Sequence, residues 1–328
     1  MSRTTDVLLT ATAPAIWGST YLVTTELLPA GYPLTVAMLR ALPAGLLLLL
    51  LVRRLPQGVW WPRTFLLGAL NFSFFWAMLF VSAYRLPGGV AATVGAIQPL
   101  IVLGLSRAVI GTTVRPLAVF AGLAGIGGVA LLVLTPSAAL DPVGVAAGLA
   151  GAVAMAFGTV LSHHWKPPVP PLTFTAWQLT AGGLLLVPVA LWFEPALPVP
   201  TTENLLGFLY LGVIGAALTY IVWFRGLARL DPATISPLGF LSPLVAVVLG
   251  WALLGQDLGL LQIAGMLVVL GSVWLSQRAQ AARPVSDGIS PRRPAPAGVQ
   301  PSTRCRPHGR DRRRSSRKGR PPWCHGIP

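Results

Sequence analysis

Apolar residues fill long stretches of this chain, and short polar stretches separate them. A helix needs roughly 20 apolar residues to cross about 30 Å of hydrocarbon. Stretches of about this length predict ten transmembrane helices, at 7–28, 33–52, 64–84, 89–110, 116–134, 142–163, 172–193, 205–227, 233–254 and 258–277. Residues 46–52 are apolar on every face, unlike a membrane-barrel strand. Because lipid offers the backbone no hydrogen bonds, we expect an all-α integral membrane fold.

The composition agrees with a membrane protein and places much of the charge in one terminal segment. Hydrophobic residues make up 54% of the 328 residues and charged residues 10%, against about 25% charged in soluble domains. The net charge is +15, but more than half of the 24 Lys and Arg lie in 278–328. This Pro-, Arg- and Ser-rich segment is predicted to be a disordered tail, either solvated or bound to anionic lipid. We expect no nucleic-acid partner.

The two halves of the apolar region repeat one pattern. With Pro243 set on Pro99, other residues align as well: Leu211-Gly212 with Leu67-Gly68, Arg229-Leu230 with Arg85-Leu86, Trp17-Gly18-Ser19 with Phe157-Gly158-Thr159, and Arg40 with Gln178. Residues 1–137 and 138–277 therefore form two repeats of five spans. Because five is odd, the second repeat is inverted relative to the first. Inverted repeats are typical of secondary transporters, whose substrate binds near the membrane midplane between the repeats.

The loops between spans predict the orientation. With the N-terminus inside, the inner loops hold eight cations: Arg53, Arg54, Arg63, Arg107, Arg115, Lys166, Arg225 and Arg229. The outer loops then hold one cation, Arg85, and five acids: Glu26, Asp141, Glu194, Glu203 and Asp257. Positive charge is enriched in cytoplasmic loops. We therefore expect a multi-pass protein of the inner (plasma) membrane with both termini in the cytoplasm.

Four segments carry a resemblance to a known family. They are WGSTYLV at 17–23, AMLRALPAG at 37–45, AATVGAIQPLIVLGLS at 91–106 and ATISPLGFLSPLVAVVLGWALLG at 233–255. Because these four segments occur in this order, residues 7 to about 277 resemble the drug/metabolite transporter superfamily, and within it the EamA-type exporters. The resemblance implies ten helices as two inverted repeats, and efflux. This chain has Gly255-Gln256 where such proteins often have Gly-Glu, so a role of that acid does not carry over.

Arg40 is the main candidate for a functional side chain. It lies well inside the second predicted span, and an arginine there costs at least about 2.5–3.5 kcal/mol on insertion scales. We interpret it as a counter-ion for a substrate carboxylate. The alternatives are that it reaches the outer interface or holds neighbouring carbonyl groups. Its repeat mate, Gln178, is uncharged.

Other polar and aromatic residues lie at comparable depth. With Arg40 and Gln178, the predicted substrate-binding set contains Trp17, Ser19, Tyr21, Asn71, Trp76, Gln98, Trp177, Tyr220, Ser236 and Ser242. The polar members could instead only join helices, at roughly 0.6 kcal/mol each. Pro99, Pro237 and Pro243 interrupt the hydrogen bonds of their helices and are predicted hinges, with a role in packing as the alternative.

These patterns predict a secondary transporter that exports a small metabolite, such as an amino acid, by alternating access. The alternatives are import of the same solutes, or a membrane-embedded enzyme or lipid-handling protein with Arg40 as phosphate anchor. No catalytic set, metal site or cofactor is predicted, so we do not expect an enzyme. The predicted partners are a small-molecule solute and the lipid bilayer. The spacing Gly144-x-x-x-Gly148 favours close helix packing and is compatible with a homodimer.

Overall fold

A computed structural model describes residues 2–86, 88–133 and 141–281, and all regular structure in these ranges is helical. The first half contains α1 (Arg3–Leu27), α2 (Pro33–Val52), α3 (Trp60–Gly68), η1 (Ala69–Ser73), α4 (Phe74–Arg85), α5 (Gly88–Gly95), α6 (Gln98–Leu105), η2 (Ser106–Ile110) and α7 (Pro116–Val133). The second contains α8 (Pro142–His164), α9 (Pro171–Phe193), α10 (Thr202–Leu209), η3 (Tyr210–Leu218), α11 (Thr219–Arg229), α12 (Pro232–Ile235), η4 (Ser236–Phe240), α13 (Leu241–Leu254) and α14 (Leu260–Ala281). The predicted boundary between the repeats at 137/138 and most of the predicted tail lie outside the described residues.

The helices confirm the predicted fold class. Nine helical segments of the described chain are long and apolar enough to cross a membrane. The third predicted span corresponds to α3, η1 and α4, which follow one another without interruption from Trp60 to Arg85. The protein is therefore an all-α integral membrane protein with ten transmembrane helices in two inverted five-helix repeats.

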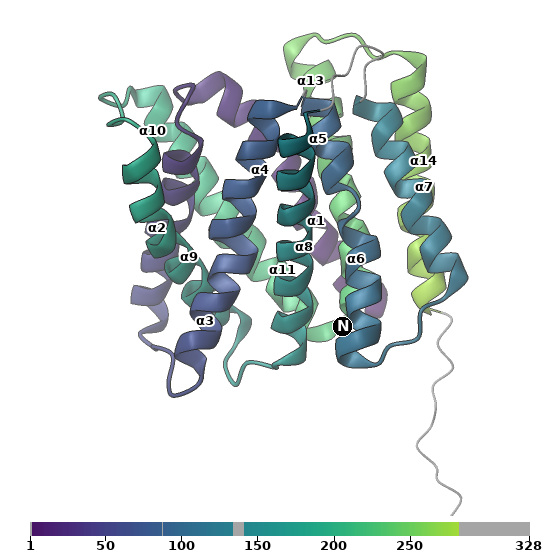
Figure 1. The fold of residues 1–328 in the computed structure, drawn as a ribbon, viewed down its shortest axis with the longest axis horizontal. Coiled ribbons are helices and arrows are strands. Elements are labelled where there is room, and N and C mark those ends of the chain that lie inside the picture. Colours follow the sequence, from purple (N-terminus) through teal and green to yellow (C-terminus); the bar gives the residue numbers. More distant parts are fainter. Residues whose placement is uncertain (1, 87, 134–140, 282–328) are drawn as a thin grey trace, which may run out of the picture. The chain divides into compact units, whose positions relative to one another are not determined.

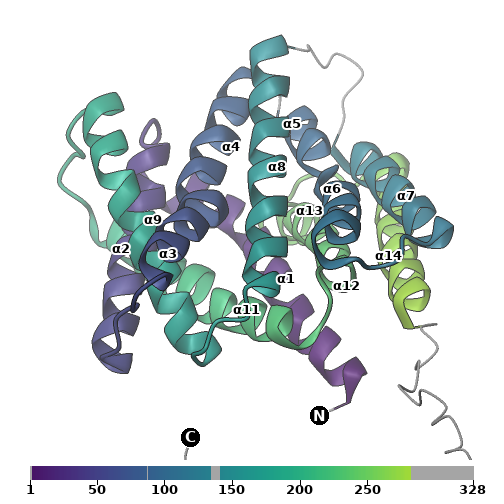
Figure 2. The same cartoon turned by 60° about the horizontal axis from the view of Figure 1, so that its bottom comes forward.

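Helix packing follows the relation between the repeats. The two second spans pack together, as α2 with α9, and the two fifth spans do the same, as α7 with α14. Both pairs lie side by side in the two views (Figure 1 and Figure 2). The third span of each repeat also packs on the first helix of the other, as α4 on α8 and α11 on α1. The two repeats are thus interlocked, and both contribute to the interior.

Helix breaks occur at matching places in the fourth span of each repeat. In the first repeat, α5 ends at Gly95 and α6 begins at Gln98, directly before Pro99. In the second, the short α12 and the 3₁₀ helix η4, which carries Pro237, precede α13, which carries Pro243 near its start. Proline lacks an N–H group, so it fits the first turn of a helix. Hinge motion at these three prolines stays a prediction.

The third span of each repeat contains a π-helical segment, η1 in the first and η3 in the second. In a π-helical turn the hydrogen bonds join residues five apart, and such turns are frequent at functional sites. The repeat alignment, which sets Leu211 on Leu67, also sets Gly215 on Asn71. These two residues lie inside η3 and η1, so the repeats share this irregularity at the same depth.

Among the described residues, most of the cations lie at one end of the bundle. Arg63 lies over the rings of Trp60 and Trp165, with 5.3 and 5.0 Å from its Cζ to the ring centroids. Arg225 and Arg229 pair with Asp6 at 2.9 and 3.3 Å. We call this the basic end; it lies at the bottom of Figure 1, where α3 begins and α8 ends.

The predicted glycine spacing in α8 serves packing within the chain. A Cβ atom on Gly144 would lie 2.7 Å from the Leu86 side chain, and one on Gly148 would lie 2.8 Å from the Ser82 hydroxyl. Only glycine lets α8 approach the end of the third span this closely. This stretch of α8 therefore packs against the end of the third span of the same chain.

Candidate functional site

Arg40 of α2 reaches from the first repeat into the second. Its Nη2 donates a hydrogen bond of 2.6 Å to the carbonyl oxygen of Gly215 in η3. Its guanidinium also lies over the ring of Trp76 in α4, 5.2 Å from the centroid. The side chain is half-buried. A charged group in the interior of the bundle therefore contacts both repeats.

The π-helical segment explains why the Gly215 carbonyl accepts this bond. The backbone N–H of Thr219 donates to Ile214 and Ala216 rather than to Gly215, which an α-helix would require. The Gly215 oxygen accepts instead from Arg40 and, at 2.8 Å, from the Thr219 hydroxyl. The irregular backbone thus creates an acceptor for the arginine in the middle of a membrane span.

Aromatic rings surround this contact. Trp17 of α1 donates from Nε1 to the Thr219 hydroxyl at 2.9 Å, and its ring lies 5.0 Å from Tyr220 and 5.1 Å from Trp223. Phe72 of η1 lies between Trp76 and Tyr220, at centroid distances of 5.4 and 4.6 Å. We call this group the Arg40 cluster; it comprises Trp17, Arg40, Phe72, Trp76, Gly215, Thr219, Tyr220 and Trp223.

The cluster includes four residues of the predicted set and others outside it. Trp17, Arg40, Trp76 and Tyr220 were predicted from their depth and chemistry. Phe72 and Gly215 were not, because a phenylalanine or glycine in an apolar span is indistinguishable from packing. The alignment of Gly215 with Asn71 is the one sequence signal that could have found it.

Asn71 and Gln178 form a second polar contact between the repeats. Asn71 Nδ2 donates to Gln178 Oε1 at 2.7 Å and to the Ser162 hydroxyl at 3.3 Å. All three side chains are buried, and Gln178 Nε2 has no hydrogen-bond partner among the residues that the structure describes. Gly158 of α8 packs directly against the Asn71 carboxamide, where a Cβ atom would collide with it. Since Gln178 aligns with Arg40 and Asn71 with Gly215, this is the repeat equivalent of the Arg40 contact.

The structure places the other predicted residues outside the Arg40 cluster. Trp177 packs against Trp60 and donates from Nε1 to the Arg54 carbonyl at 2.6 Å, at the basic end. The Ser19 hydroxyl bonds that of Tyr210 at 2.7 Å. The remaining members are placed as follows: Gln98 at the start of α6, Ser236 buried in η4, Ser242 half-buried in α13, and Tyr21 in α1, with its side chain outside the described residues.

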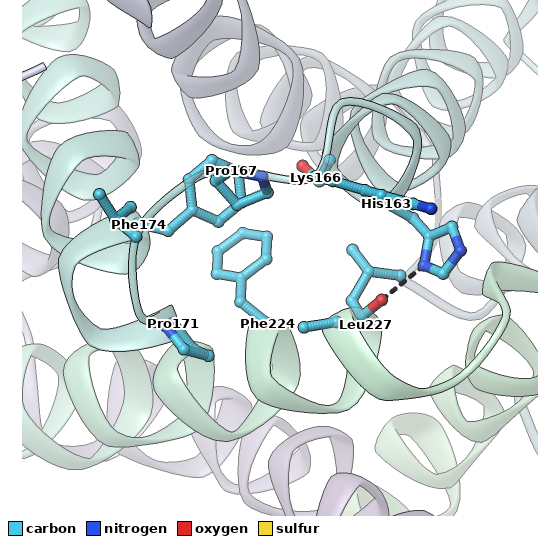
Figure 3. A pocket seen from close by; sticks show the side chains of 10 residues that line it. His163, Lys166, Pro167, Pro171, Phe174, Phe224 and Leu227 are labelled. Carbon is cyan, nitrogen blue, oxygen red and sulfur yellow. Dashed lines mark hydrogen bonds between the residues drawn. The ribbon is translucent and has the colours of Figure 1, made fainter. Parts of the chain in front are cut away.

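A cavity of about 260 Å³ lies near the cluster, at the basic end. Its lining comes from α8, α9, α11 and the loop after α8: Ser162, His163, Lys166, Pro167, Val169, Pro171, Phe174, Phe224, Leu227 and Ala228. Figure 3 shows Phe224 inside this ring of residues. Phe224 also lies 6.0 Å from Tyr220, centroid to centroid. One turn of α11 therefore joins the cavity to the Arg40 cluster. We call it the inner cavity.

Comparison with known proteins gives the family. The model of the EamA-like transporter family matches residues 4–134 and 142–277. The chain belongs to this family. The resemblance seen in the sequence is thereby confirmed, and the protein is a multi-pass membrane transporter.

Named relatives agree with this assignment. Protein PecM of Dickeya dadantii (strain 3937) is 46% identical over 267 residues, which cover 81% of this chain and 90% of PecM. The uncharacterized inner membrane transporter YedA of Escherichia coli (strain K12) is 30% identical over 289 residues, covering 84% and 94%. A solved crystal structure superposes with a TM-score of 0.75 at 21% identity, covering 85% of this chain and 99% of that one. At this identity the last comparison supports the fold alone.

Proposed function

We propose that this EamA-family transporter exports a small carboxylate-bearing metabolite, such as an amino acid, and that Arg40 binds the carboxylate. The observation that carries the proposal is the contact of Arg40 with Gly215, because it places a cation between the repeats in the middle of two membrane spans. Intramembrane charges are costly and usually mark a transport site. In this proposal the chain moves a solute and catalyses no reaction.

The chemistry of arginine supports a carboxylate. The guanidinium is planar, carries five N–H donors and matches the two oxygens of a carboxylate. Its bond to Gly215 uses one donor, and Trp76 covers one face of the group. A solute carboxylate that replaces the Gly215 carbonyl would exchange a neutral acceptor for a charged one. An arginine–carboxylate pair can also form two parallel N–H···O bonds, which add energy and geometric specificity to the single bond that the carbonyl accepts.

The arrangement of the repeats supports alternating access. The Arg40 cluster takes residues from α1, α2, α4 and η1 of the first repeat and from η3 and α11 of the second, so relative motion of the repeats changes its geometry. The helix breaks near Pro99, Pro237 and Pro243 supply hinges at matching places. Broken helices in corresponding positions are typical of the moving parts of transporters. We assign the moving units to 1–137 and 138–277.

The orientation completes the proposal. The basic end, which contains the inner cavity, faces the cytoplasm, and the tail at 278–328 is also cytoplasmic. At the opposite end, the Glu194 carboxylate accepts from the backbone N–H groups of Leu34 and Thr35 at 2.6 and 2.7 Å. Asn204 there donates to the Leu27 carbonyl at 2.8 Å. These bonds hold the ends of α2 and α1 to the second repeat on the side opposite the cavity.

Counterflow in proteoliposomes tests the proposal. The wild-type protein and the variants Arg40→Lys and Arg40→Ala are assayed with labelled amino acids, other metabolites and cationic dyes. We expect saturable flux of a carboxylate-bearing solute with Arg40, and a loss of about tenfold or more with Lys, which keeps the charge but not the planar fork. The Ala variant should be inactive.

Trp177→Phe is the matched control, because Trp177 belongs to the same predicted set but lies outside the cluster. Its flux should stay close to that of the wild type, because its indole bonds the Arg54 carbonyl at the basic end and not the Arg40 cluster. Each variant is checked for a monodisperse folded protein. Equal flux in the wild type and in folded Arg40→Ala would show that Arg40 does not bind the solute. Flux of cationic dyes alone would show that the substrate carries no carboxylate.

A further inference from the structure

The inner cavity has basic groups on one side and apolar groups on the other. Of its lining residues, His163 and Lys166 can carry positive charge, and none is an acid. Figure 3 shows these two side chains near each other, away from Phe174 and Pro171. Small-molecule pockets typically measure about 300–1,000 Å³, so a cavity of about 260 Å³ suits a small metabolite. The lining matches a solute with an anionic head and an apolar body.

The charged groups around the cavity also favour an anionic solute. His163 Nδ1 donates to the Leu227 carbonyl at 2.6 Å, since a carbonyl can only accept. The carboxylate on the other side of α11, Asp6, is already paired with Arg225 and Arg229. Within the described residues no acid forms an ion pair with Lys166. The ammonium group at the rim of the cavity is therefore available to an anion.

The backbone at Lys166 is strained, which indicates a constraint on its position. Lys166 has φ of 46°, in the left-handed region, and it precedes Pro167. Proline favours extended conformations in the residue before it, and left-handed conformations are costly for residues other than glycine. Such strain clusters at ligand sites, where the surrounding structure enforces it. Here it fixes the start of the Lys166 side chain at the cavity rim.

Residues that line the cavity also connect it to the Arg40 cluster and to the Asn71–Gln178 bond. Phe224 in its lining leads to Tyr220 and hence to the Arg40 cluster. Ser162, another lining residue, accepts a hydrogen bond from Asn71, which is bonded to Gln178. Ser162 would therefore separate a solute in the cavity from the Asn71–Gln178 bond, and Phe224 would separate it from Tyr220 of the Arg40 cluster.

We propose that the inner cavity is a binding site for solutes that join an anionic head to an apolar body, with the head at Lys166 and the body against Phe174 and Phe224. Resting on the proposed function, we further assign it as the cytoplasmic loading site, from which the solute reaches Arg40. The proposal narrows the substrate class from small metabolites to amphiphilic anions. An anionic lipid head group shares this chemistry, so the test must separate the two.

Equilibrium binding to protein in phosphatidylcholine nanodiscs tests the site. The probes are labelled 3-phenylpropionate, its cationic counterpart 3-phenylpropylamine, and acetate, which lacks the apolar body. Measurements are made with Arg40 present and in Arg40→Gln, which removes the deeper cation. We expect phenylpropionate to bind in both proteins. The amine should bind at least about tenfold more weakly because it lacks the charge-assisted contact. Acetate should also bind at least about tenfold more weakly, because it buries no apolar body.

Variants at the rim assign the binding to Lys166. Lys166→Ala should weaken phenylpropionate binding about tenfold, and Lys166→Arg should restore it to within about threefold. Arg53→Ala is the matched control: Arg53 is also a cation of the basic end with a left-handed backbone, φ 48°, but it does not line the cavity. Equal weakening by Arg53→Ala would indicate general surface charge and overturn the site, as would unchanged binding to Lys166→Ala.

A second arm distinguishes a soluble anion from a lipid. The measurement is repeated with about one fifth phosphatidylglycerol in the nanodisc. Unchanged binding of phenylpropionate supports a loading site for soluble anions, whereas displacement by the lipid would assign the cavity to a head group and overturn the loading role. Because binding is measured in the Arg40→Gln protein, the site can stand even where flux proves independent of Arg40, and the two proposals fail separately.

Discussion

Asn71 and Gly215 hold equivalent positions in the two repeats, and each bonds a residue from the second span of the other repeat. Gly215 accepts from Arg40, and Asn71 donates to Gln178. Both lie in π-helical segments, η3 and η1. The two-fold relation thus extends from helix packing to single hydrogen bonds, while the chemistry differs: one contact is charged and half-buried, the other neutral and fully buried.

The buried Asn71–Gln178 bond should respond non-additively to mutation. Asn71→Leu leaves the Gln178 and Ser162 side chains buried without their partner, which should cost about 1–3 kcal/mol of stability. Adding Gln178→Leu removes one of these orphaned groups, so the double variant should be more stable than the sum of the single losses predicts. Thermal unfolding of the wild type, the two single variants and the double variant in one detergent measures the coupling free energy. Strict additivity would mean that the bond contributes nothing.

Gly158 should be essential for the position of Asn71. A Cβ atom on Gly158 would overlap the Asn71 carboxamide, so Gly158→Ala must displace that side chain from Gln178 and Ser162. We expect a loss of about 1–3 kcal/mol, as for overpacking elsewhere. Gly127→Ala is the control, because nothing lies within 4 Å of its Cβ position and alanine favours helix. A neutral Gly158→Ala would contradict the packing described here.

Membrane physics explains which parts of this structure could be predicted from sequence. Each span must bury its backbone, so apolar runs of sufficient length predict the helices directly. Arg40 could be identified because an intramembrane charge is rare. Its acceptor could not, because a backbone carbonyl has no sequence signal and only the π-helical turn frees the one at Gly215. Trp177 lies well inside its predicted span, yet its indole bonds the Arg54 carbonyl in the loop after α2. This partner depends on how the helices are offset along their axes.

The ion pairs of Asp6 should contribute more than that of Arg85. The Asp6 side chain is 10% exposed and has two arginine partners, the nearer at 2.9 Å. Arg85 and Asp141 lie 3.7 Å apart, with side chains 51% and 37% exposed. Exposed pairs contribute about 0–1 kcal/mol, whereas removal of one partner from a buried group leaves uncompensated charge. The partial exposure of Arg229 and Arg225 reduces the expected effect of Asp6→Asn to about 1–3 kcal/mol.

Thermal unfolding at low and high salt checks this difference. Asp6→Asn should lower the melting temperature clearly at both salt concentrations, because the carboxylate is shielded from solvent ions. Arg85→Ala should change it little at low salt and less at high salt, since screening weakens exposed pairs. Equal effects of the two substitutions would show that burial of Asp6 does not strengthen its pairs.

The proposed orientation predicts which loops can be labelled from outside the cell. The loop after α2 lies at the basic end and contains the exposed Gln57, while the exposed Asp257 follows α13 at the opposite end. With Cys305 and Cys324 replaced by serine, a single cysteine at Asp257 should react with a membrane-impermeant maleimide in intact cells. A cysteine at Gln57 should react only after lysis, because the cations that surround it favour the cytoplasmic side. The reverse pattern would place the inner cavity on the outside, and the transporter would then load its solute there, as an importer would.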